Sequence, residues 1–459
     1  MAGKEYPKFS FYGRIFCIVM LLAGIFYYNT EYSYKSHKVL NIYCWDDSLK
    51  KILETYYPAY HKETQTIGDV KVHWIMIPGT DNIYQTMVDK AIAESDESLP
   101  DERIDLFLVE ADYVRKYTRT PEAAKSLAEL GITESELADQ FSYTREAAMD
   151  AEGIQRGISW QATPGVLIYR RDIARRVFGT DDPEQVQALV ADWPAFEGSA
   201  ARVRAAGFYM LAGYFDTYRV FASRADTAWI NDKKEIVLND ALRQWRDQTA
   251  RLVALDQIHT NDLWDQDWNK SVRGDVFCYF GPAWLINHAL QDLSLETSVA
   301  DGGTVEKGNG TFGEWAVCRG PQPYFWGGTW ICAAKGTDNA DLVADIMRTI
   351  CCNKEVALEM AQKQTEFVNH RSIMQKLAND SSFGIPFLDG QNAYEIMNSV
   401  ADTIRVRNLT PYDQGIHEAF QSASREYFAG IISKERSWQK FLATVWLKYP
   451  ELQNASRVR

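Results

Sequence analysis

The sequence predicts an α/β protein, and two observations support this prediction. Strand-like and helix-like segments alternate between residues 38 and 110, an order that is typical of a parallel sheet with helices on both faces. The chain has 459 residues, which is too long for one small core and suits two lobes of ordinary domain size. Hydrophobic residues make up 46% and charged residues 24% of the chain, the balance of a folded globular protein.

Three predicted strands open the folded part. They are residues 38–45 (KVLNIYCW), 69–77 (DVKVHWIMI) and 103–110 (RIDLFLVE), all short and rich in β-branched or aromatic residues. Helical spacing follows the first two strands, and residues 46–48 resemble a helix start. Because ligands of parallel sheets lie at the carboxyl ends of strands, two segments are candidates for a site. These segments are Trp45-Asp46-Asp47 and Glu110-Ala111-Asp112.

The rest of the chain is less regular. Residues 157–179 predict a strand that contains a proline and then a helix, and residues 274–290 predict a strand, a Gly-Pro turn and a helix. A further strand is expected around 330–334, with a helix opening near Asn339. Residues 202–257 have helical spacing apart from a short strand near 234–238. A Gly-rich loop is expected at 297–313, and the remainder to the C-terminus is mainly helical.

An apolar stretch at residues 15–28 (IFCIVMLLAGIFYY) follows Lys4, Lys8 and Arg14. A basic start before such a stretch is an export signal. The stretch is short for a full span of about 20 residues, so its length leaves a cleaved signal peptide and a retained anchor both open. No small-x-small cleavage site follows, and Ile25 stands where a lipobox would require Cys. We therefore expect residues 1–37 to be an uncleaved membrane anchor with the rest outside the cell; cleavage would give an exported or periplasmic protein.

Charge and cysteine spacing exclude several classes of partner. The net charge is −13 and no basic run stands out, which argues against a nucleic-acid partner. None of the seven cysteines has metal-ligand spacing, and HExxH and GxSxG motifs are missing from the sequence. We therefore expect no metal, no cofactor and no catalysis, while the disulfide state stays open. Aromatic residues reach 13%; they suit the flat faces of sugar rings, although most of them can equally be core.

Four landmarks in order carry a family resemblance. They are LNIYCWDD (40–47), IDLFLVEADYVRKY (104–117), ISWQATPGVLIYRRDI (158–173), and the pair VFCYFGPAWLIN (276–287) and GPQPYFWGGTWICAAKGTDNADLVADIM (320–347). Over residues 38–448 this order resembles the extracellular solute-binding proteins of carbohydrate ABC importers, the maltose-binding-protein-like group of family 1.

The resemblance implies a two-lobed periplasmic-binding-protein-like (type II) fold with discontinuous lobes. It places lobe 1 at 38–158 and 282–332, and lobe 2 at 159–281 and 333–459. A solute would bind in the cleft between the lobes and be trapped by hinge closure. The implied function is that of a monomeric, non-catalytic component that captures a small polar solute, a sugar or oligosaccharide, and delivers it to the transmembrane permease subunits of an ABC importer.

The resemblance also suggests which side chains bind the solute. Sugars present apolar faces and a rim of hydroxyls, so aromatic rings and carboxylates or amides are suited to hold them. Each position has a structural alternative, since the tryptophans can be core and Asp46 can cap a helix. Gly327 and Gly328 would let the backbone approach a ligand closely, or simply allow a tight turn. The expected ligand-binding residues are Trp45, Asp46, Glu110, Asp112, Gln161, Trp264, Trp284, Trp326, Trp330 and Tyr412.

Two other functions stay open at this point. A membrane-anchored sensor would present the solute to a signalling partner, and the missing lipobox Cys is compatible with this role. A secreted enzyme on the same fold, such as a thiaminase-like transferase, would need a nucleophilic cysteine on the first crossing segment. The aligned position lies near Thr163 and the segment contains no Cys. A glycosidase would need two carboxyl groups at working distance, which Asp46 and Asp47 as sequence neighbours do not supply.

Overall fold

The computed structural model describes Met20 and residues 39–79, 82–231 and 233–453. The described chain divides into two compact units. The first contains the chain up to Phe107 together with Ala333–Val343, and the second contains Leu108–Cys332 and Ala344–Arg459. The predicted anchor at 15–28 lies, apart from Met20, outside the described residues. In the part of the chain that is described, no helix is both long enough and apolar enough to cross a bilayer.

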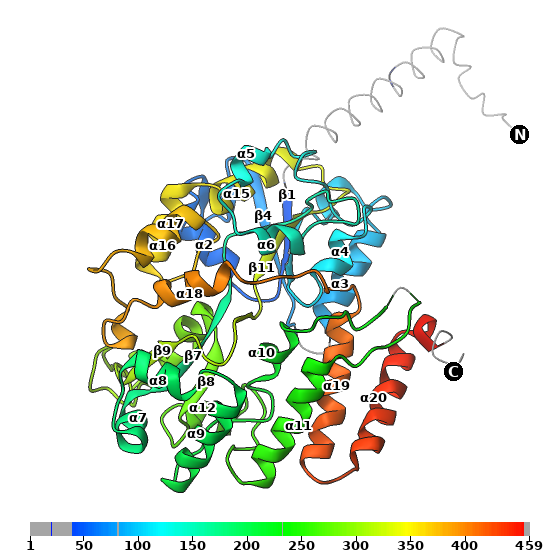
Figure 1. The fold of residues 1–459 in the computed structure, drawn as a ribbon. Coiled ribbons are helices and arrows are strands. Elements are labelled where there is room, and N and C mark those ends of the chain that lie inside the picture. Colours follow the sequence, from blue (N-terminus) through cyan, green and yellow to red (C-terminus); the bar gives the residue numbers. More distant parts are fainter. Residues whose placement is uncertain (1–19, 21–38, 80–81, 232, 454–459) are drawn as a thin grey trace, which may run out of the picture. The chain divides into compact units, whose positions relative to one another are not determined.

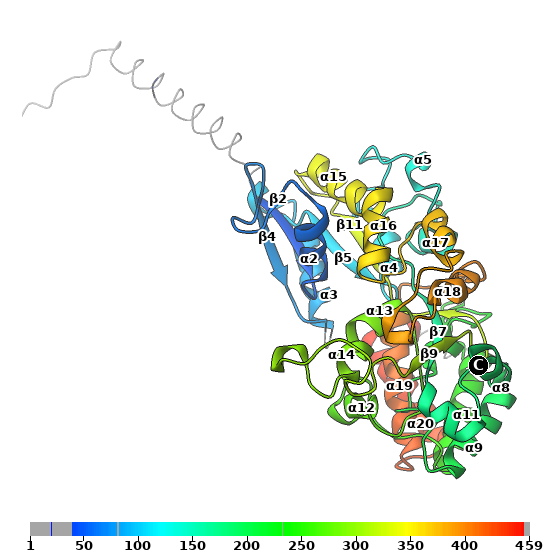
Figure 2. The ribbon, with the colours of Figure 1, turned by 90° about the vertical axis from the view of Figure 1, so that its left-hand side faces the viewer.

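The first unit is a sheet with a parallel centre (Figures 1 and 2). Strand β1 (Val39–Cys44) pairs in parallel with β4 (Val70–Met76) and with the start of β5 (Leu106–Glu110). Strands β2 (Tyr60–His61) and β3 (Thr66–Ile67) extend the β4 edge in antiparallel fashion. Helices α2 (Ser48–Tyr56) and α3 (Ile83–Ala93) lie on opposite sides of this sheet. The strand–helix alternation predicted from the sequence is therefore confirmed.

Asp105 connects the segment Ala333–Val343 to the rest of the first unit by hydrogen bonds. Its carboxylate accepts hydrogen bonds from the main-chain nitrogen of Asn41 at 2.8 Å, the hydroxyl of Thr337 at 2.6 Å and the amide of Asn339 at 3.1 Å. Burial raises the pKa of Asp105 to about 6, although these hydrogen bonds act in the opposite direction. Segments more than 230 positions apart in the sequence are thus joined around one buried carboxyl group.

The second unit is built around β7 (Pro164–Arg170), all of whose residues are buried. This strand pairs in antiparallel fashion with β8 (Cys278–Gly281), β9 (Trp315–Cys318) and β10 (Tyr324–Phe325). Separately, β6 (Ile158–Ser159) pairs with β11 (Thr329–Ala333). The helices are α4 (Val114–Thr118), α5 (Glu134–Leu137), α6 (Ser142–Ala147), α7 (Arg171–Phe178), α8 (Pro183–Leu189), α9 (Trp193–Ala205), α10 (Tyr218–Ala222), α11 (Asp240–Ala254), α12 (Gln266–Ser271), α13 (Ala283–Leu285), α14 (Gln291–Ser294), α15 (Ala340–Cys351), α16 (Lys354–Lys363), α17 (Arg371–Ala378), α18 (Ala393–Ala401), α19 (Asp413–Phe428) and α20 (Lys434–Lys448).

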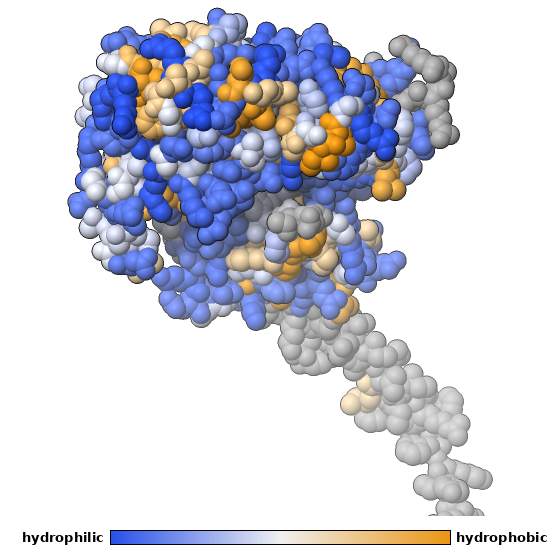
Figure 3. Space-filling view, turned by 90° about the horizontal axis from the view of Figure 1, so that it is seen from below, coloured by the Kyte–Doolittle hydropathy of each residue, from blue (hydrophilic) through white to orange (hydrophobic). Residues whose placement is uncertain are grey.

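Two apolar cores stabilise this unit. One lies between the β7 sheet and helices α7, α8 and α9, and the other joins α10 and α11 to the antiparallel pair α19 and α20. The face seen in Figure 3 is mainly hydrophilic, with hydrophobic side chains in separate patches. This distribution is the one expected when the apolar faces of amphipathic elements are buried against each other.

The prediction of a nearly continuous helix over 202–257 is wrong. Helix α9 ends at Ala205, because Gly207 adopts a φ of +88°, which ends the helix in a left-handed turn. Residues between α9 and α10 instead form bridges to neighbouring segments, such as Gly213 with Asn261. Among the described residues of the remainder, only α10 and α11 are helical. The strand predicted near 234–238 is present as a single antiparallel bridge between Ile230 and Ile236.

Tyr324 lies against a glycine of the central strand. A Cβ atom on Gly165 would come within 2.0 Å of the Tyr324 ring, so a side chain cannot occupy that position. The two residues are paired across β7 and β10, and the Tyr324 hydroxyl donates a hydrogen bond to the main-chain oxygen of Val166 at 3.0 Å. This contact sets the position of β10 and of the loop that follows it.

The described cysteines are free thiols. They are Cys44, Cys278, Cys318, Cys332, Cys351 and Cys352. Burial raises the pKa of the Cys44, Cys318 and Cys352 thiols to about 12. A thiol that stays protonated at neutral pH is a poor nucleophile, so these residues do not supply the thiolate that a thiaminase-like reaction would need.

Candidate functional site

Three of the predicted tryptophans contact one another in the second unit. Trp326 follows β10, Trp284 belongs to α13 and Trp264 precedes α12. The ring centroids of Trp326 and Trp284 are 4.9 Å apart, those of Trp284 and Trp264 are 6.3 Å apart, and those of Trp264 and Trp268 are 5.1 Å apart. Trp264 is 46% exposed, and Trp284 and Trp326 are half-buried. We call these four residues the tryptophan cluster; Trp268 is buried, and the other three are partly open to solvent.

The backbone around Trp326 is fixed by hydrogen bonds to a neighbouring strand and to the cluster. Its main-chain nitrogen donates to the oxygen of Thr163 at 3.2 Å, and the Thr163 hydroxyl donates to the oxygen of Gly327 at 3.0 Å. Nε1 of Trp284 donates to the oxygen of Trp326 at 3.1 Å. Gly327 and Gly328 have φ values of +71° and +108°, where glycine is favoured. The Gly-Gly pair therefore allows a tight turn and also lets the Trp284 ring approach the backbone.

Two carboxyl groups and one guanidinium border the cluster. Glu110 ends β5, and its Oε2 accepts a hydrogen bond from the main-chain nitrogen of Asp112 at 2.8 Å. The guanidinium of Arg219 donates to both Asp112 oxygens, at 2.6 and 2.5 Å, the bidentate geometry of a strong ion pair. A Cβ atom placed on Gly327 would lie 3.3 Å from Nε1 of Trp284 and 3.7 Å from Oε1 of Glu110. The Glu110 carboxyl group therefore lies at the edge of the tryptophan cluster.

The environment changes the pKa values of these two carboxyl groups in opposite directions. Burial raises the pKa of Glu110, and the nearby Asp112 carboxylate raises it further. Burial also acts to raise the pKa of Asp112, but the charge of Arg219 outweighs it and holds that pKa below its usual value. Asp112 is therefore the permanently ionised partner of Arg219, whereas Glu110 can either donate or accept a hydrogen bond.

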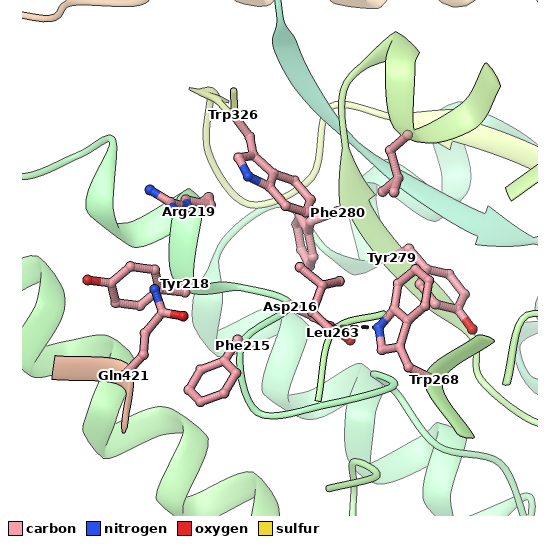
Figure 4. A pocket seen from close by; sticks show the side chains of 11 residues that line it. Phe215, Asp216, Tyr218, Arg219, Leu263, Trp268, Tyr279, Phe280, Trp326 and Gln421 are labelled. Carbon is pink, nitrogen blue, oxygen red and sulfur yellow. Dashed lines mark hydrogen bonds between the residues drawn. The ribbon is translucent and has the colours of Figure 1, made fainter. Parts of the chain in front are cut away.

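A cavity of about 70 Å³ lies beside Trp326 and Arg219 (Figure 4). Its wall is mainly aromatic, and Asp216 supplies a carboxyl group. That group accepts hydrogen bonds from Nε1 of Trp268 at 3.2 Å and from the main-chain nitrogens of Ala212 and Gly213 at 2.8 and 3.0 Å. Burial raises the pKa of Asp216 to about 6. The cavity is smaller than the roughly 300–1,000 Å³ of common ligand pockets, so it can hold only part of a solute of sugar size or larger.

A buried histidine lies behind the Asp112–Arg219 pair. Nδ1 of His417, on α19, accepts a hydrogen bond from Nε1 of Trp229 at 3.3 Å and is also bonded to the hydroxyl of Tyr218. Because an indole N–H can only donate, the proton of the neutral ring is on Nε2. Burial lowers the pKa of His417 to about 4. The histidine is therefore neutral at pH 7 and leaves Arg219 as the counter-ion of Asp112.

Three other predicted site residues make hydrogen bonds or ring contacts within the second unit. Gln161 is buried and its amide donates to the hydroxyl of Thr329 at 3.3 Å. Trp330 is 2% exposed, and its Nε1 donates to the oxygen of Thr144 at 2.8 Å. Tyr412 is half-buried and packs edge-to-face on Tyr449, with ring centroids 5.1 Å apart. The structure does not bring these three into the tryptophan cluster, and their contact with a solute stays a prediction.

Trp45 and Asp46 belong to the first unit. Trp45 follows β1 and is half-buried edge-to-face against Tyr84, with centroids 5.4 Å apart. Asp46 is exposed, and its carboxylate accepts a hydrogen bond from the main-chain nitrogen of Ser48 at 2.9 Å. This turn leads directly into α2, but the N-cap residue of that helix is Asp47 and no side chain caps it, so Asp46 is not the helix cap. Solute binding by these two residues also stays a prediction.

Sequence reasoning missed the polar residues that complete the site. Arg219 and Tyr218 belong to α10, and Asp216 lies just before it. All three fall within the stretch for which helical spacing was the only signal, and a single Arg or Asp in such a stretch is ordinarily a solvated surface residue. In the described residues, groups of three or more His, Cys, Asp or Glu side chains that could hold a metal ion are absent.

Comparison with known families gives the class of protein. The model of the family described as "Bacterial extracellular solute-binding protein" matches residues 44–379, well over half of the chain. The chain belongs to this family. The predicted resemblance is confirmed, and because the family binds solutes and is non-enzymatic, the prediction that the chain is not an enzyme is confirmed as well. A comparison with curated protein sequences gave no match.

Solved structures show the same fold at low sequence identity. An extracellular solute-binding protein of family 1 superposes with a TM-score of 0.69 at 17% identity, over 89% of this solute-binding protein and 98% of that chain. The ABC-transporter-associated binding protein of B. animalis subsp. lactis, in complex with β-1,6-galactobiose, gives 0.65 at 16% identity over 91% and 98%. The galacto-N-biose/lacto-N-biose I-binding protein of Bifidobacterium longum gives 0.62 at 13% identity over 91% and 97%. The solute-binding protein thus has the mixed α/β, two-lobed fold of periplasmic binding proteins, as predicted.

Proposed function

We propose that this solute-binding protein is the substrate-binding component of an ABC importer and that its solute is an oligosaccharide. The observation that carries the proposal is the tryptophan cluster bordered by Glu110 and by the Asp112–Arg219 pair. Aromatic faces and hydroxyl-binding carboxyl groups, placed together, match the two kinds of surface that a sugar presents. The binding of β-1,6-galactobiose and lacto-N-biose by proteins of the same fold supports this choice.

The geometry assigns a role to each part of the site. Trp326, Trp284 and Trp264 offer successive aromatic faces, so that more than one sugar ring can be covered. Glu110 lies at the edge of these rings and can accept a hydrogen bond from a sugar hydroxyl or donate one to it. The cavity beside Trp326 is too small for a whole sugar and would take a substituent such as a hydroxymethyl group.

The remaining parts of the proposal are predictions from the sequence. One lobe would consist of residues 38–158 and 282–332, and the other of residues 159–281 and 333–459. The two lobes would close around the solute and trap it. The protein would act as a monomer, deliver its solute to the transmembrane permease subunits, and be held at the membrane by residues 15–28. The remaining proposed solute contacts are Trp45, Asp46, Gln161, Trp330 and Tyr412.

The test is a binding screen of the full chain against oligosaccharides. Thermal unfolding is measured with maltotriose, cellobiose, galactobiose and lacto-N-biose, followed by calorimetry of any sugar that raises the melting temperature. A sugar at 100 times its Kd stabilises the folded state by about 2.7 kcal/mol, which moves the melting temperature of a chain of this size by a few degrees. We expect binding of one linkage class and its loss in Trp326→Ala.

A matched substitution distinguishes a site effect from a general loss of packing. Trp438 belongs to α20 and packs on Phe441 with ring centroids 4.9 Å apart, outside the tryptophan cluster. Trp438→Ala should lower the melting temperature without changing the Kd. If no sugar shifts the melting temperature, or if Trp326→Ala binds as tightly as the native chain, the oligosaccharide proposal is wrong.

A further inference from the structure

The cavity beside the tryptophan cluster contains a single basic side chain. Of the residues that line it, Arg219 is the only Lys, Arg or His, and Asp216 is the only acid. Glu110 adds a second carboxyl group at the edge of the cluster and has no ion pair among the described residues. Any favourable interaction of this site with a negatively charged solute would therefore depend on Arg219.

The charge of Arg219 is already paired with that of Asp112. Its two terminal nitrogens contact the two oxygens of Asp112, and the side chains of Arg219 and Asp112 are only 24% and 16% exposed. A guanidinium binds a carboxylate through this same pair of nitrogens. A solute carboxylate would have to displace Asp112 or share the guanidinium with it, and in either case two anions would lie beside one cation.

We propose that Asp112 is a specificity-determining positioning residue: by holding the guanidinium of Arg219, it restricts the site to uncharged sugars and excludes sugars that carry a carboxylate. This inference rests on the proposed oligosaccharide function. A uronate would be desolvated beside Asp112 and Asp216 without a free counter-ion, and buried charges without partners bind poorly. The hydroxyl groups of a neutral sugar need no such counter-ion.

The test compares neutral and acidic forms of the same sugar. Gluco- and galacto-configured disaccharides are titrated by calorimetry into the full chain, next to the same disaccharides with C6 oxidised to a carboxylate. We expect the native chain to bind the uronate at least about 30-fold more weakly, because the Asp112 carboxylate repels it and it would lack a cation of its own. Asp112→Asn keeps the size of the side chain but weakens its hold on Arg219, so the ratio should fall below about 5-fold.

A double variant and a matched control make the result specific. In Asp112→Asn combined with Arg219→Gln the high ratio should return, because the released guanidinium is gone. Asp256→Asn removes the carboxylate from Arg204 in an exposed ion pair of the same unit, where the Asp256 side chain is 65% exposed, and should leave the ratio unchanged. If thermal unfolding shows that Asp112→Asn is not folded, Arg219→Gln alone is the second test. It should not improve binding of the uronate.

The outcomes separate the two proposals. A native chain that binds the uronate as tightly as the neutral sugar overturns the charge selectivity and leaves the oligosaccharide function intact. An unchanged ratio in folded Asp112→Asn overturns the role of Asp112. Binding of neither form of any sugar overturns the proposed function itself, and the selectivity with it.

Discussion

Nε1 of Trp284 donates a hydrogen bond to the main-chain oxygen of Trp326 at 3.1 Å, and the rings of these residues meet edge-to-face at 69°. One indole thus stabilises the loop that carries the other, and in the proposed function it also contacts the sugar. The two tryptophans are 42 positions apart in the sequence. Their contact links α13 to the turn after β10, so a change at either residue should affect the other.

Trp284→Phe separates these two contributions. Phenylalanine keeps an aromatic ring but lacks the N–H donor, so the oxygen of Trp326 loses its partner. A neutral hydrogen bond contributes about 0.5–1.5 kcal/mol, which corresponds to a roughly 2- to 10-fold weaker Kd for the bound sugar, measured by calorimetry. Trp284→Ala should weaken binding further. A phenylalanine variant that binds the sugar like the native chain would show that the hydrogen bond from Trp284 to Trp326 has no role in binding.

Gly327→Ala should destabilise the chain and weaken binding together. A non-glycine residue at a φ of +71° costs about 1–2 kcal/mol, and the new methyl group would lie 3.3 Å from Nε1 of Trp284. The control is Gly198→Ala in α9, where a methyl group meets no atom within 4 Å and alanine is favoured by about 0.5–1 kcal/mol. Thermal unfolding should move in opposite directions for the two variants; the same direction for both would contradict the assignment of strain at Gly327.

Asp413 should make the chain less stable as the pH rises from about 4 to 7. Burial raises the pKa of this carboxyl group from 3.8 to about 7 in the folded chain. The folded state then binds a proton more tightly than the unfolded state, so the contribution is fully present below pH 3.8 and is lost as the pH rises through 7. In Asp413→Asn this loss, of the order of a few kcal/mol at most, should disappear. The Thr410 hydroxyl, which donates to the carboxylate, can accept from the new amide.

Parallel thermal unfolding of the native chain and of Asp413→Asn between pH 4 and pH 8 measures this difference. The variant should be relatively more stable at pH 8 than at pH 4. An equal pH dependence of the two chains would mean that Asp413 is ionised in the folded state throughout this range.

His417 should have the opposite pH dependence, although it lies one helical turn from Asp413 on α19. Burial lowers its pKa from 6.5 to about 4, so its contribution is fully present above pH 6.5 and is lost as the pH falls through 4. Nitrogen-15 NMR of the histidine rings should show the neutral Nε2–H form at pH 5.5, because Trp229 donates to Nδ1. An imidazolium signal for His417 at that pH would contradict this arrangement.

The order of elements could be predicted because local patterns determine it. Strands β1, β4 and β5 and helix α2 follow directly from short β-branched runs and helix-start residues, and they form within a few residues of the predicted bounds. The interval after Ala205 could not be predicted in this way. There, Gly213 is in contact with the main-chain oxygen of Asn261, and such tertiary contacts override helical spacing.

The tryptophans of the candidate site could be named from the sequence, but their arrangement and the polar residues in and just before α10 could not. Trp264, Trp284 and Trp326 were each expected through the family resemblance, whereas their contact depends on how α12, α13 and the β10 turn pack. Arg219 carries no local signal, because its partner Asp112 is 107 positions away. The tertiary fold determines which residues pair over such separations. Local patterns in a single sequence do not predict these pairs.

The packing of Tyr324 against Gly165 also has a consequence for the order in which the protein folds. Three residues of the candidate site precede β10 in the chain: Glu110, Arg219 and Trp284. The loop that carries Trp326 is positioned only when β10 pairs with β7. In that pairing Tyr324 contacts Val166, which lies 158 positions earlier in the sequence. Contacts of such long sequence separation form after the intervening chain is available. A polypeptide that is made N-terminus first can therefore complete the proposed binding site only after residues beyond 326 are available to fold.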